Sequence, residues 1–195
     1  YETLIYGHPF IEEQLGDLTF EVSSNSFFQT NTIQGERLYD ETAKAAGLTG
    51  EDIVFDLYCG TGTIGLYLSR QAKEVYGFEV IRSAIEDAEQ NAERNKIANA
   101  QFYKANLDTY FKTGQLPRRI PNPDVVIIDP PRAGMHPDMT NYLHKFKAKK
   151  IVYVSCNPTT QARDAKVLGE NGYGIKSAVM VDMFPHTPHI ESIVL

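Results

Sequence analysis

This sequence of 195 residues contains no tryptophan and only two cysteines, Cys59 and Cys156. Two cysteines are too few for a disulfide framework, and they lack zinc-ligand spacing, so we expect reduced thiols and no metal site. A run of about 18 apolar residues and a charged-then-apolar leader are also missing, which argues against a membrane span and a signal peptide. A cytoplasmic protein with no membrane contact is therefore expected.

Basic charge is scarce as well, because 25 acidic residues outnumber 19 basic ones and give a formal net charge of -6. This balance argues against a surface that binds phosphates non-specifically, so a nucleic-acid partner would need local basic residues. The length and a hydrophobic content of 42% fit one compact domain with a small appended element. The chain opens at Tyr1 without an initiator methionine, and we expect a fragment of a longer protein.

The spacing of apolar residues predicts an α/β domain at 32–195, preceded by a short β extension at 1–31 that packs on it. Residues 4–22 alternate and turn like two or three antiparallel strands. An amphipathic helix follows at 32–46 and ends at Gly47, after which strands and helices alternate, as in a parallel sheet with covering helices. The predicted strands are 53–57, 75–78, 101–104, 124–128, one from 151, 175–182 and 190–195; the predicted helices are 63–72, 83–94, 137–146 and 159–170, with an irregular loop at 112–123.

A glycine-rich turn follows the first buried strand, where Gly60, Gly62 and Gly65 match the GxGxxG pattern. Glycines here let the backbone approach either the pyrophosphate of a dinucleotide or the amino-acid half of S-adenosylmethionine, and Glu79 at the end of the next strand suits ribose hydroxyls in both. Asp56 separates the two, because a carboxylate attracts a sulfonium and an ammonium but repels a pyrophosphate. S-adenosylmethionine is therefore favoured over NAD, and glycines that serve packing alone are the alternative.

Two later strands also end in residues suited to chemistry, and ligands of open α/β sheets bind beyond the carboxyl ends of strands. The sequence DPPR at 129–132 forms a rigid turn, since its two prolines fix the backbone. Arg132 stands where methyltransferases of exocyclic amines usually have an aromatic residue, which favours another acceptor and a contact to RNA; an arginine in solvent is the alternative. Cys156 follows an apolar strand, where it is either a nucleophile or a small buried hydrophobe.

The end of the chain places Glu191 at the start of an apolar strand, where a carboxylate needs a partner or a task. His186 and His189 just before it are a weak metal pair, because no third ligand is evident. Upstream, Phe27 and Phe28 lie in a segment too polar for a strand, and either core packing or a contact to a base explains their rings.

Taken together, these motifs resemble the RNA uracil-C5 methyltransferases, which use S-adenosylmethionine to make 5-methyluridine in ribosomal and transfer RNA. The resemblance covers essentially the whole chain: SFFQTN at 26–31, DLYCGTGTIGL at 56–66, Glu79, Asn106, DPPR at 129–132, SCNP at 155–158 and HTPHIES at 186–192. It implies a class I, Rossmann-like domain with a mostly parallel seven-stranded sheet and helices on both faces. It also implies an N-terminal RNA-binding β-barrel outside this chain, often with an iron-sulfur module, whose four cysteine ligands are not present here.

The resemblance also implies roles for individual residues. Cys156 would be the nucleophile that adds to C6 of uracil, and Glu191 the base that removes the C5 proton. The cofactor contacts would be Gln29, Tyr58, Glu79, Asn106 and Asp129, in addition to Asp56, Gly60 and Gly62 of the glycine turn. The substrate contacts would be Gln29, Phe28, Asp129 and Arg132. Relatives often have another residue, such as asparagine, at Thr63, so no contact is assigned there.

The flanking sequence is most similar to the bacterial branch that modifies 23S ribosomal RNA, so ribosomal RNA is the expected substrate. Three alternatives remain open: a uridine-C5 methyltransferase of transfer RNA, an NAD-dependent oxidoreductase built on the glycine turn, and a domain that docks on RNA or protein without catalysis.

Overall fold

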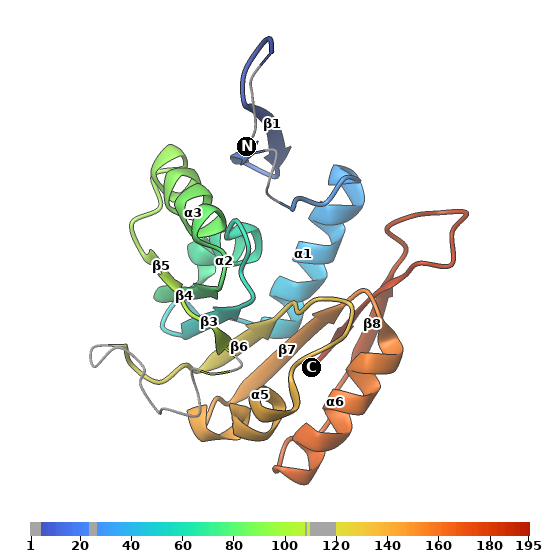
Figure 1. The fold of residues 1–195 in the computed structure, drawn as a ribbon. Coiled ribbons are helices and arrows are strands. Elements are labelled where there is room, and N and C mark those ends of the chain that lie inside the picture. Colours follow the sequence, from blue (N-terminus) through green and yellow to red (C-terminus); the bar gives the residue numbers. More distant parts are fainter. Residues whose placement is uncertain (1–4, 24–26, 108, 110–119) are drawn as a thin grey trace.

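The computed structural model of the chain describes residues 5–23, 27–107, 109 and 120–195. Its centre is a seven-stranded sheet in the order β5-β4-β3-β6-β7-β9-β8 (Figure 1). The first five of these strands are parallel, whereas β9 runs antiparallel to both of its neighbours. The strands are β3 (Ile53–Leu57), β4 (Glu74–Glu79), β5 (Ala100–Lys104), β6 (Val125–Ile128), β7 (Lys150–Ser155), β8 (Ala178–Val181) and β9 (Glu191–Val194).

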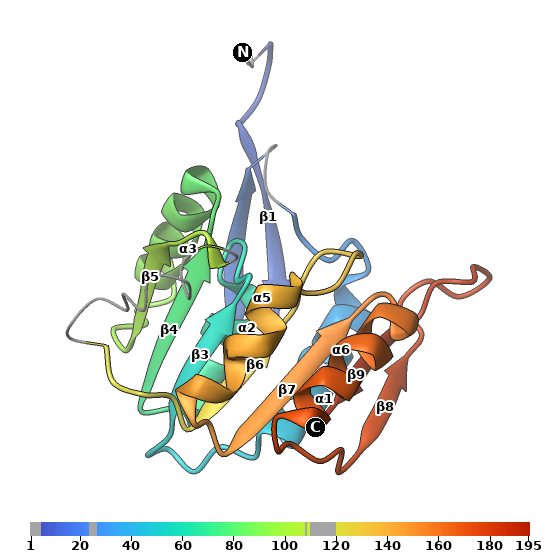
Figure 2. The same cartoon turned by 60° about the horizontal axis from the view of Figure 1, so that its bottom comes forward.

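Helices cover both faces of this sheet (Figure 2). Helices α1 (Thr32–Ala46), α2 (Thr63–Leu68) and α3 (Arg82–Arg94) cover one face, and α5 (Pro137–Tyr142) and α6 (Pro158–Glu170) cover the other. All four residues of β6 are buried because alternate side chains enter two separate cores, Val125 and Ile127 on one face and Val126 and Ile128 on the other. The predicted α/β class, with its mostly parallel sheet of seven strands, is confirmed.

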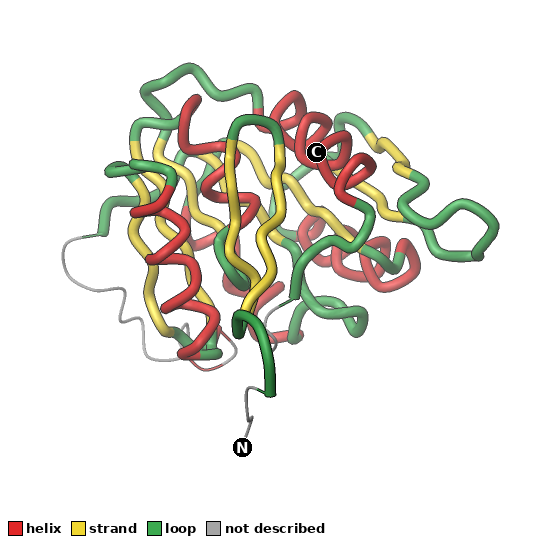
Figure 3. The backbone as a smooth tube through the Cα atoms, turned by 90° about the horizontal axis from the view of Figure 1, so that it is seen from above, coloured by secondary structure: helices red, strands yellow, loops and turns green. Residues whose placement is uncertain are grey.

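The N-terminal extension is a hairpin of β1 (Phe10–Leu15) and β2 (Leu18–Ser23), whose strands lie side by side in Figure 3. Leu15, Leu18 and Phe20 bury their side chains in the same core as α1 and α3. The free edge of β2 is paired by two asparagines, one within α3 and one at its C-terminal cap. The Asn91 amide exchanges two hydrogen bonds with the backbone of Glu21, at 2.7 and 3.1 Å.

Asn95, the residue that caps the C-terminus of α3, makes the same exchange with the backbone of Thr19, at 2.9 and 2.8 Å. Each asparagine amide offers one acceptor and two donors, and so can stand in for a residue of a neighbouring strand. The hairpin is therefore held on the domain by hydrogen bonds as well as by apolar contact.

Several predicted boundaries agree with the structure and others do not. The helix at 32–46 and the strand at 53–57 are confirmed at both ends, and Gly47 caps α1 in the left-handed conformation with φ 51°. The predicted helix 63–72 ends at Leu68 and continues as the 3₁₀ turn Ser69–Gln71, since the Ser69 hydroxyl donates to the Leu66 carbonyl at 2.7 Å. The predicted helix 137–146 likewise divides into α5 and the 3₁₀ turn Leu143–Phe146.

The predicted strand 175–182 is reduced to β8, although the backbones of Lys176 and Ser177 still form hydrogen bonds with the backbone of Leu195. Most of the predicted loop at 112–123, like Ser26 of the SFFQTN motif, lies outside the described residues. Within the described part of the chain, no helix is long and apolar enough to cross a membrane.

Candidate active site

The predicted site residues collect at one edge of the sheet. Asn106, Glu79, Tyr58, Asp129 and Cys156 lie at or just beyond the carboxyl ends of β5, β4, β3, β6 and β7, and this is also the order of the strands across the sheet. Carboxyl ends of parallel strands share one edge, so residues far apart in sequence form a row there. The sequence motifs therefore converge on a single site.

Glu191 reaches the same edge because β9 is antiparallel to β7. Ser155, the last residue of β7, pairs with Ser192, so the next position in this register sets Cys156 opposite Glu191. The Cβ atoms of directly opposed residues in antiparallel strands lie about 5 Å apart, and the charge of Glu191 acts on the Cys156 thiol. Two side chains 35 positions apart in sequence (191 − 156) are thus neighbours through strand pairing alone.

The electrostatic environment of Cys156 is acidic. The half-buried Cys156 thiol has a pKa raised first by burial, then by the negative charges of Glu191 and Asp129, while Arg132 opposes them. Glu191 is 7% exposed, and burial raises its pKa to about 7. The pKa of Asp129 is raised to about 8 by burial, with Glu191 and Asp56 adding to the effect. These groups act on one another and form one cluster.

The glycine turn adopts the backbone that its sequence predicts. Tyr58 has φ 62°, Gly60 has φ 53° and Gly62, at the start of α2, has φ 76°. A Cβ on Gly62 would meet the Phe102 ring at 2.8 Å, so close packing requires this glycine, whereas a Cβ on Gly60 would meet nothing within 4 Å. The open side of Gly60 leaves space for a ligand to approach the backbone.

Asp56 lies beneath this turn rather than at its mouth. It is 1% exposed, and its Oδ2 accepts a hydrogen bond from the Gly65 amide at 2.8 Å. Its Oδ1 has no hydrogen-bond partner among the described residues, and burial raises its pKa to about 7. The sequence predicts that Asp56 attracts the cationic groups of a ligand. In the structure Asp56 also holds the first turn of α2.

Glu79 is fixed by the backbone around it. Its Oε2 accepts from the Gly60 amide at 3.2 Å, and its Oε1 accepts from the amides of Val80 at 2.7 Å and Ile81 at 2.9 Å. A carboxylate oxygen can accept two hydrogen bonds, and Oε2 accepts only the one from Gly60 among the described residues, so capacity remains for a ligand. Val80 and Ile81 are 51% and 53% exposed and form an apolar surface next to the carboxylate.

The segment before α1 places its aromatic residues differently from one another. Phe28 is 8% exposed and its ring lies 5.7 Å from that of Phe20 in the core, whereas Phe27 is 74% exposed. Gln29 is buried and packs its Cβ against Gly35 of α1, and Asn31 caps α1 while donating to the Met183 carbonyl at 2.9 Å. Core packing therefore accounts for Phe28, and Phe27 is the exposed ring of this segment.

The sequence profile of the tRNA (Uracil-5-)-methyltransferase family matches residues 3–195. The chain belongs to this family. The resemblance on which the sequence analysis relied is thus confirmed, and the alternative of an NAD-dependent oxidoreductase is not retained.

Curated relatives are similar to this chain over almost its whole length. An uncharacterized RNA methyltransferase of Chlorobaculum tepidum is 49% identical over 98% of this chain and 40% of its own length. One of Clostridium acetobutylicum is 46% identical over 100% of this chain and 42% of its own length. The chain thus spans about two fifths of these curated relatives.

The crystal structure of the Pyrococcus abyssi tRNA (uracil-54, C5)-methyltransferase with S-adenosyl-L-homocysteine superposes with a TM-score of 0.82. It is 41% identical and covers 97% of this chain and 44% of that one. The crystal structure of the M. jannaschii tRNA m1G37 methyltransferase has a TM-score of 0.67 at 13% identity, covers 97% of this chain and 57% of that one, and shares the fold alone.

Tyr39 is a residue near the candidate site that the sequence did not indicate. This residue of α1 is 3% exposed and donates a hydrogen bond to the Thr63 hydroxyl, at the start of α2, at 3.2 Å. Its phenol also lies within electrostatic reach of Asp129, Asp56 and Glu191. In the sequence Tyr39 is one more apolar position of an amphipathic helix, so no local signal distinguishes it.

His186 and His189 are exposed in the loop before β9. Among the residues that the structure describes, no group of three or more histidine, cysteine, aspartate or glutamate side chains is arranged to hold a metal ion.

Proposed function

We propose that this chain is the catalytic domain of an RNA methyltransferase that converts a uridine to 5-methyluridine, with S-adenosylmethionine as methyl donor. One observation carries the proposal: the β7–β9 register that sets the Cys156 thiol opposite the Glu191 carboxylate, on the edge of the sheet that holds the glycine turn. A nucleophile and a base on one substrate ring are the two groups that methylation of uracil C5 requires.

The donor site fits the residues present. S-adenosylmethionine supplies a methyl group on a positively charged sulfur. The Glu79 carboxylate, fixed by backbone amides, suits ribose hydroxyls, and the open backbone at Gly60 suits the amino-acid half. The orphaned buried Oδ1 of Asp56 has capacity for a cationic ligand. Further proposed contacts are Gln29, Tyr58, Gly62, Asn106 and Asp129.

The proposed reaction begins at Cys156. The thiol loses its proton to solvent, which is open to it because the residue is only half-buried, and its sulfur forms a bond to C6 of the uracil. The ring then has enolate character, and C5 takes the methyl group as the bond between methyl and sulfonium breaks. Arg132 or Gln29 donates to the charge that develops at O4, and Asp129 orients the base.

Glu191 completes the reaction by accepting the C5 proton, after which the bond between sulfur and C6 breaks and releases Cys156. A pKa of about 7 leaves a large fraction of this carboxylate ionised near neutral pH and keeps it a stronger base than an exposed glutamate. The acidic surroundings raise the pKa of Cys156 and favour the thiol before substrate binds. Positive charge from Arg132 and from the bound donor acts in the opposite direction and favours the thiolate.

The RNA has to present its uridine out of the stack. We propose that Arg132 contacts the RNA or the base, and that a ring at 27–28 stacks on the base; Phe28 was the sequence-based choice, and the exposure of Phe27 supports that ring instead. Binding of the rest of the RNA is assigned to an RNA-binding region outside this chain, since the chain corresponds to only 40% of the first relative.

Ribosomal RNA is the proposed substrate, from the likeness of the flanking sequence to the 23S branch. Transfer RNA is the second candidate, because the Pyrococcus abyssi relative acts on uracil 54 of tRNA at 41% identity. Mass-spectrometric mapping of 5-methyluridine in ribosomal and transfer RNA from a deletion strain separates the two. A unique loss in 23S RNA supports the first, and a loss in transfer RNA replaces it.

RNA that contains 5-fluorouridine tests the covalent step, because fluorine cannot leave as a proton and the adduct accumulates. Full-length protein with S-adenosylmethionine is expected to give an adduct stable to denaturing electrophoresis, and Cys156→Ala none. Cys59→Ala is the matched control, since it removes the only other thiol of the chain and is expected to form the adduct. An adduct with Cys156→Ala would overturn the assignment of the nucleophile.

A further inference from the structure

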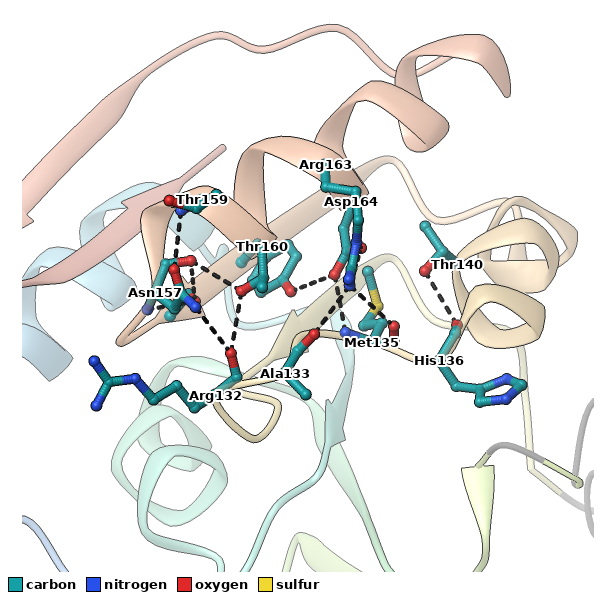
Figure 4. A network of polar contacts seen from close by, with 12 residues as sticks. Arg132, Ala133, Met135, His136, Thr140, Asn157, Thr159, Thr160, Arg163 and Asp164 are labelled. Atoms are coloured by element: carbon teal, nitrogen blue, oxygen red, sulfur yellow. Dashed lines mark hydrogen bonds and ion pairs between the residues drawn. The ribbon is translucent and has the colours of Figure 1, made fainter.

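The loop that follows β6 is tied to the helix that follows Cys156. This loop, residues 129–136, carries Asp129 and Arg132, whereas α6 begins two residues after Cys156. Figure 4 shows the polar contacts between the two segments. Pro130 and Pro131 have no backbone N–H, so the loop depends on its carbonyls and on few amides for its hydrogen bonds.

The first contact joins Arg132 to the start of α6. The Arg132 carbonyl accepts from Asn157 Nδ2 at 3.1 Å and from the Thr160 hydroxyl at 3.3 Å. Asn157 also caps α6, because its Oδ1 accepts from the Thr159 amide at 3.1 Å. Asn157, directly after Cys156, is thereby bonded to the backbone of Arg132, the residue proposed to contact the RNA. The Arg132 side chain points away from the network in Figure 4.

The second contact centres on Asp164, which is 2% exposed. Its Oδ2 accepts from the Met135 amide at 2.9 Å and from the Tyr153 hydroxyl at 2.8 Å, and Tyr153 belongs to the same strand that leads to Cys156. Its Oδ1 accepts from Arg163 Nε at 2.8 Å. A buried carboxylate with donors on both oxygens is held firmly, and removal of one donor is costly.

Arg163 closes the contact from outside. Its Nη2 donates to the carbonyls of Ala133 at 3.1 Å and Met135 at 3.4 Å, while it pairs with Asp164 at 2.7 Å. Gly134 between these carbonyls has φ 81°, and a Cβ there would lie 2.6 Å from Arg163 Nη2 and 2.7 Å from Asp164 Oδ2. Only glycine lets the pair approach the loop this closely.

From this geometry we infer that Asp164 and Arg163 are positioning residues of the proposed methyl transfer, and that they fix the loop of Asp129 and Arg132 relative to Cys156. The inference rests on the proposed function. Neither side chain is assigned to the substrate; they act by setting the distance between nucleophile and base-orienting groups. Of the proposed donor contacts only Asp129 lies on this loop, whereas Glu79 and Tyr58 lie at the ends of β4 and β3, so most of the donor site does not depend on this contact.

Three variants test the inference in the full-length protein: Asp164→Asn, Arg163→Met and Gly134→Ala. The single-turnover rate of adduct formation with 5-fluorouridine RNA is expected to fall about 100-fold for Asp164→Asn, as a displacement near 1 Å does in other active sites. The same rate should fall about 10-fold for Arg163→Met. A further variant, Arg163→Lys, should lose less, since its ammonium group can still donate hydrogen bonds. The affinity for S-adenosylhomocysteine should change far less, by no more than about twofold, because Asp129 is the only proposed donor contact on this loop.

Asp124→Asn is the matched control. Asp124 also accepts from a backbone amide, that of Ile53 at 3.0 Å, and pairs with a cation, Lys149 at 2.9 Å, but it precedes β6 at the opposite edge of the sheet. It is expected to lower the unfolding midpoint without slowing adduct formation, which separates positioning from general stability.

The outcomes distinguish a failure of the proposed function from a failure of the positioning role alone. Wild-type protein that forms no adduct overturns the proposed function and this inference with it. If wild-type protein forms the adduct and Arg163→Met and Gly134→Ala form it at the wild-type rate, the inference alone is overturned. This holds even where Asp164→Asn fails to fold, because the Arg163 side chain is 54% exposed and its loss leaves the core intact. Rates that fall only in proportion to the folded fraction also overturn it.

Discussion

At the scale of single residues, the site shows how a cysteine acquires a role from its neighbours. Buried cysteines are common and mostly inert, and the pKa of the Cys59 thiol is raised by burial, with Asp56 and Glu79 adding to the effect. Cys156 differs by being half-buried, at the tip of β7, opposite Glu191 and within reach of Arg132. Both thiols have carboxylates nearby, so partial exposure and the charge of Arg132 distinguish the proposed nucleophile from the packing thiol.

Glu191→Gln should separate the two halves of the proposed reaction. Addition of Cys156 needs no base at C5, but release does, so the variant is expected to accumulate covalent adduct on ordinary uridine RNA while turnover falls about 100-fold to 10,000-fold. Denaturing electrophoresis of labelled RNA measures the adduct, and methyl incorporation measures turnover.

Glu170→Gln, at an exposed glutamate at the end of α6, controls for the loss of one charge and should turn over normally. Normal turnover in Glu191→Gln would remove Glu191 from the role of base.

At the scale of elements, the glycine turn and α2 depend on Asp56. The carboxylate accepts from the Gly65 amide in the first turn of the helix, where the N–H groups have no partner within the helix. The three glycines of the motif are not equivalent: Gly62 and Gly65 lie against packed groups, and Gly60 faces open space. Packing and ligand access, which the sequence left as alternatives, therefore apply to different glycines of one turn.

Gly65→Ala should weaken this element. A Cβ there would lie 2.7 Å from Asp56 Oδ2, and the strain of moving a buried carboxylate is expected to lower the free energy of unfolding by about 1–3 kcal/mol. The midpoint of urea unfolding measures the change.

Gly169→Ala is the matched control, because Gly169 lies in α6 with nothing within 4 Å of an added Cβ. It should raise stability by about 0.5–1 kcal/mol, as alanine restricts the unfolded chain. Equal effects of the two substitutions would contradict the role given to Asp56.

At the scale of the whole molecule, the sheet gathers buried acids at its functional edge. The pKa values of Asp56 and Glu191 are about 7 and that of Asp129 is about 8, raised mainly by burial. In the unfolded chain these groups ionise near pH 4. Between these pH values the folded state binds more protons than the unfolded chain. The contribution of these groups to the free energy of unfolding is therefore fully present below about pH 4 and is lost as pH rises through 7–8.

Asp129→Asn should therefore reduce the loss of stability between pH 5 and pH 8. The neutral amide has no ionised form to bury, and the variant is expected to gain on the order of 2 kcal/mol relative to wild type between the two values. Urea unfolding at each pH provides the measurement.

Asp124→Asn serves as the control, because its pKa is lowered by the Ile53 amide and by Lys149. Its contribution is present above pH 4 and is lost only as pH falls below that value, so it should leave the slope between pH 5 and pH 8 unchanged. A slope in Asp129→Asn equal to that of wild type would show that Asp129 is not buried as an acid.

The sequence by itself determined most of the elements, although only some of their ends. Apolar periodicity located α1 and β3 at both boundaries, and the motifs at 56–66, 129–132 and 155–158 marked the strand ends that carry the site. These features are local: a helix period, a strand run or a glycine turn is decided by residues a few positions apart.

Only the tertiary structure decided which of these ends meet. The insertion of β9 between β7 and β8 puts Glu191 opposite Cys156, α1 brings Tyr39 to Thr63, and the fold of the loop after β6 brings Met135 to Asp164. Strand order and helix packing join segments tens of residues apart through hydrogen bonds and buried surface, and no local pattern in the sequence records those partners.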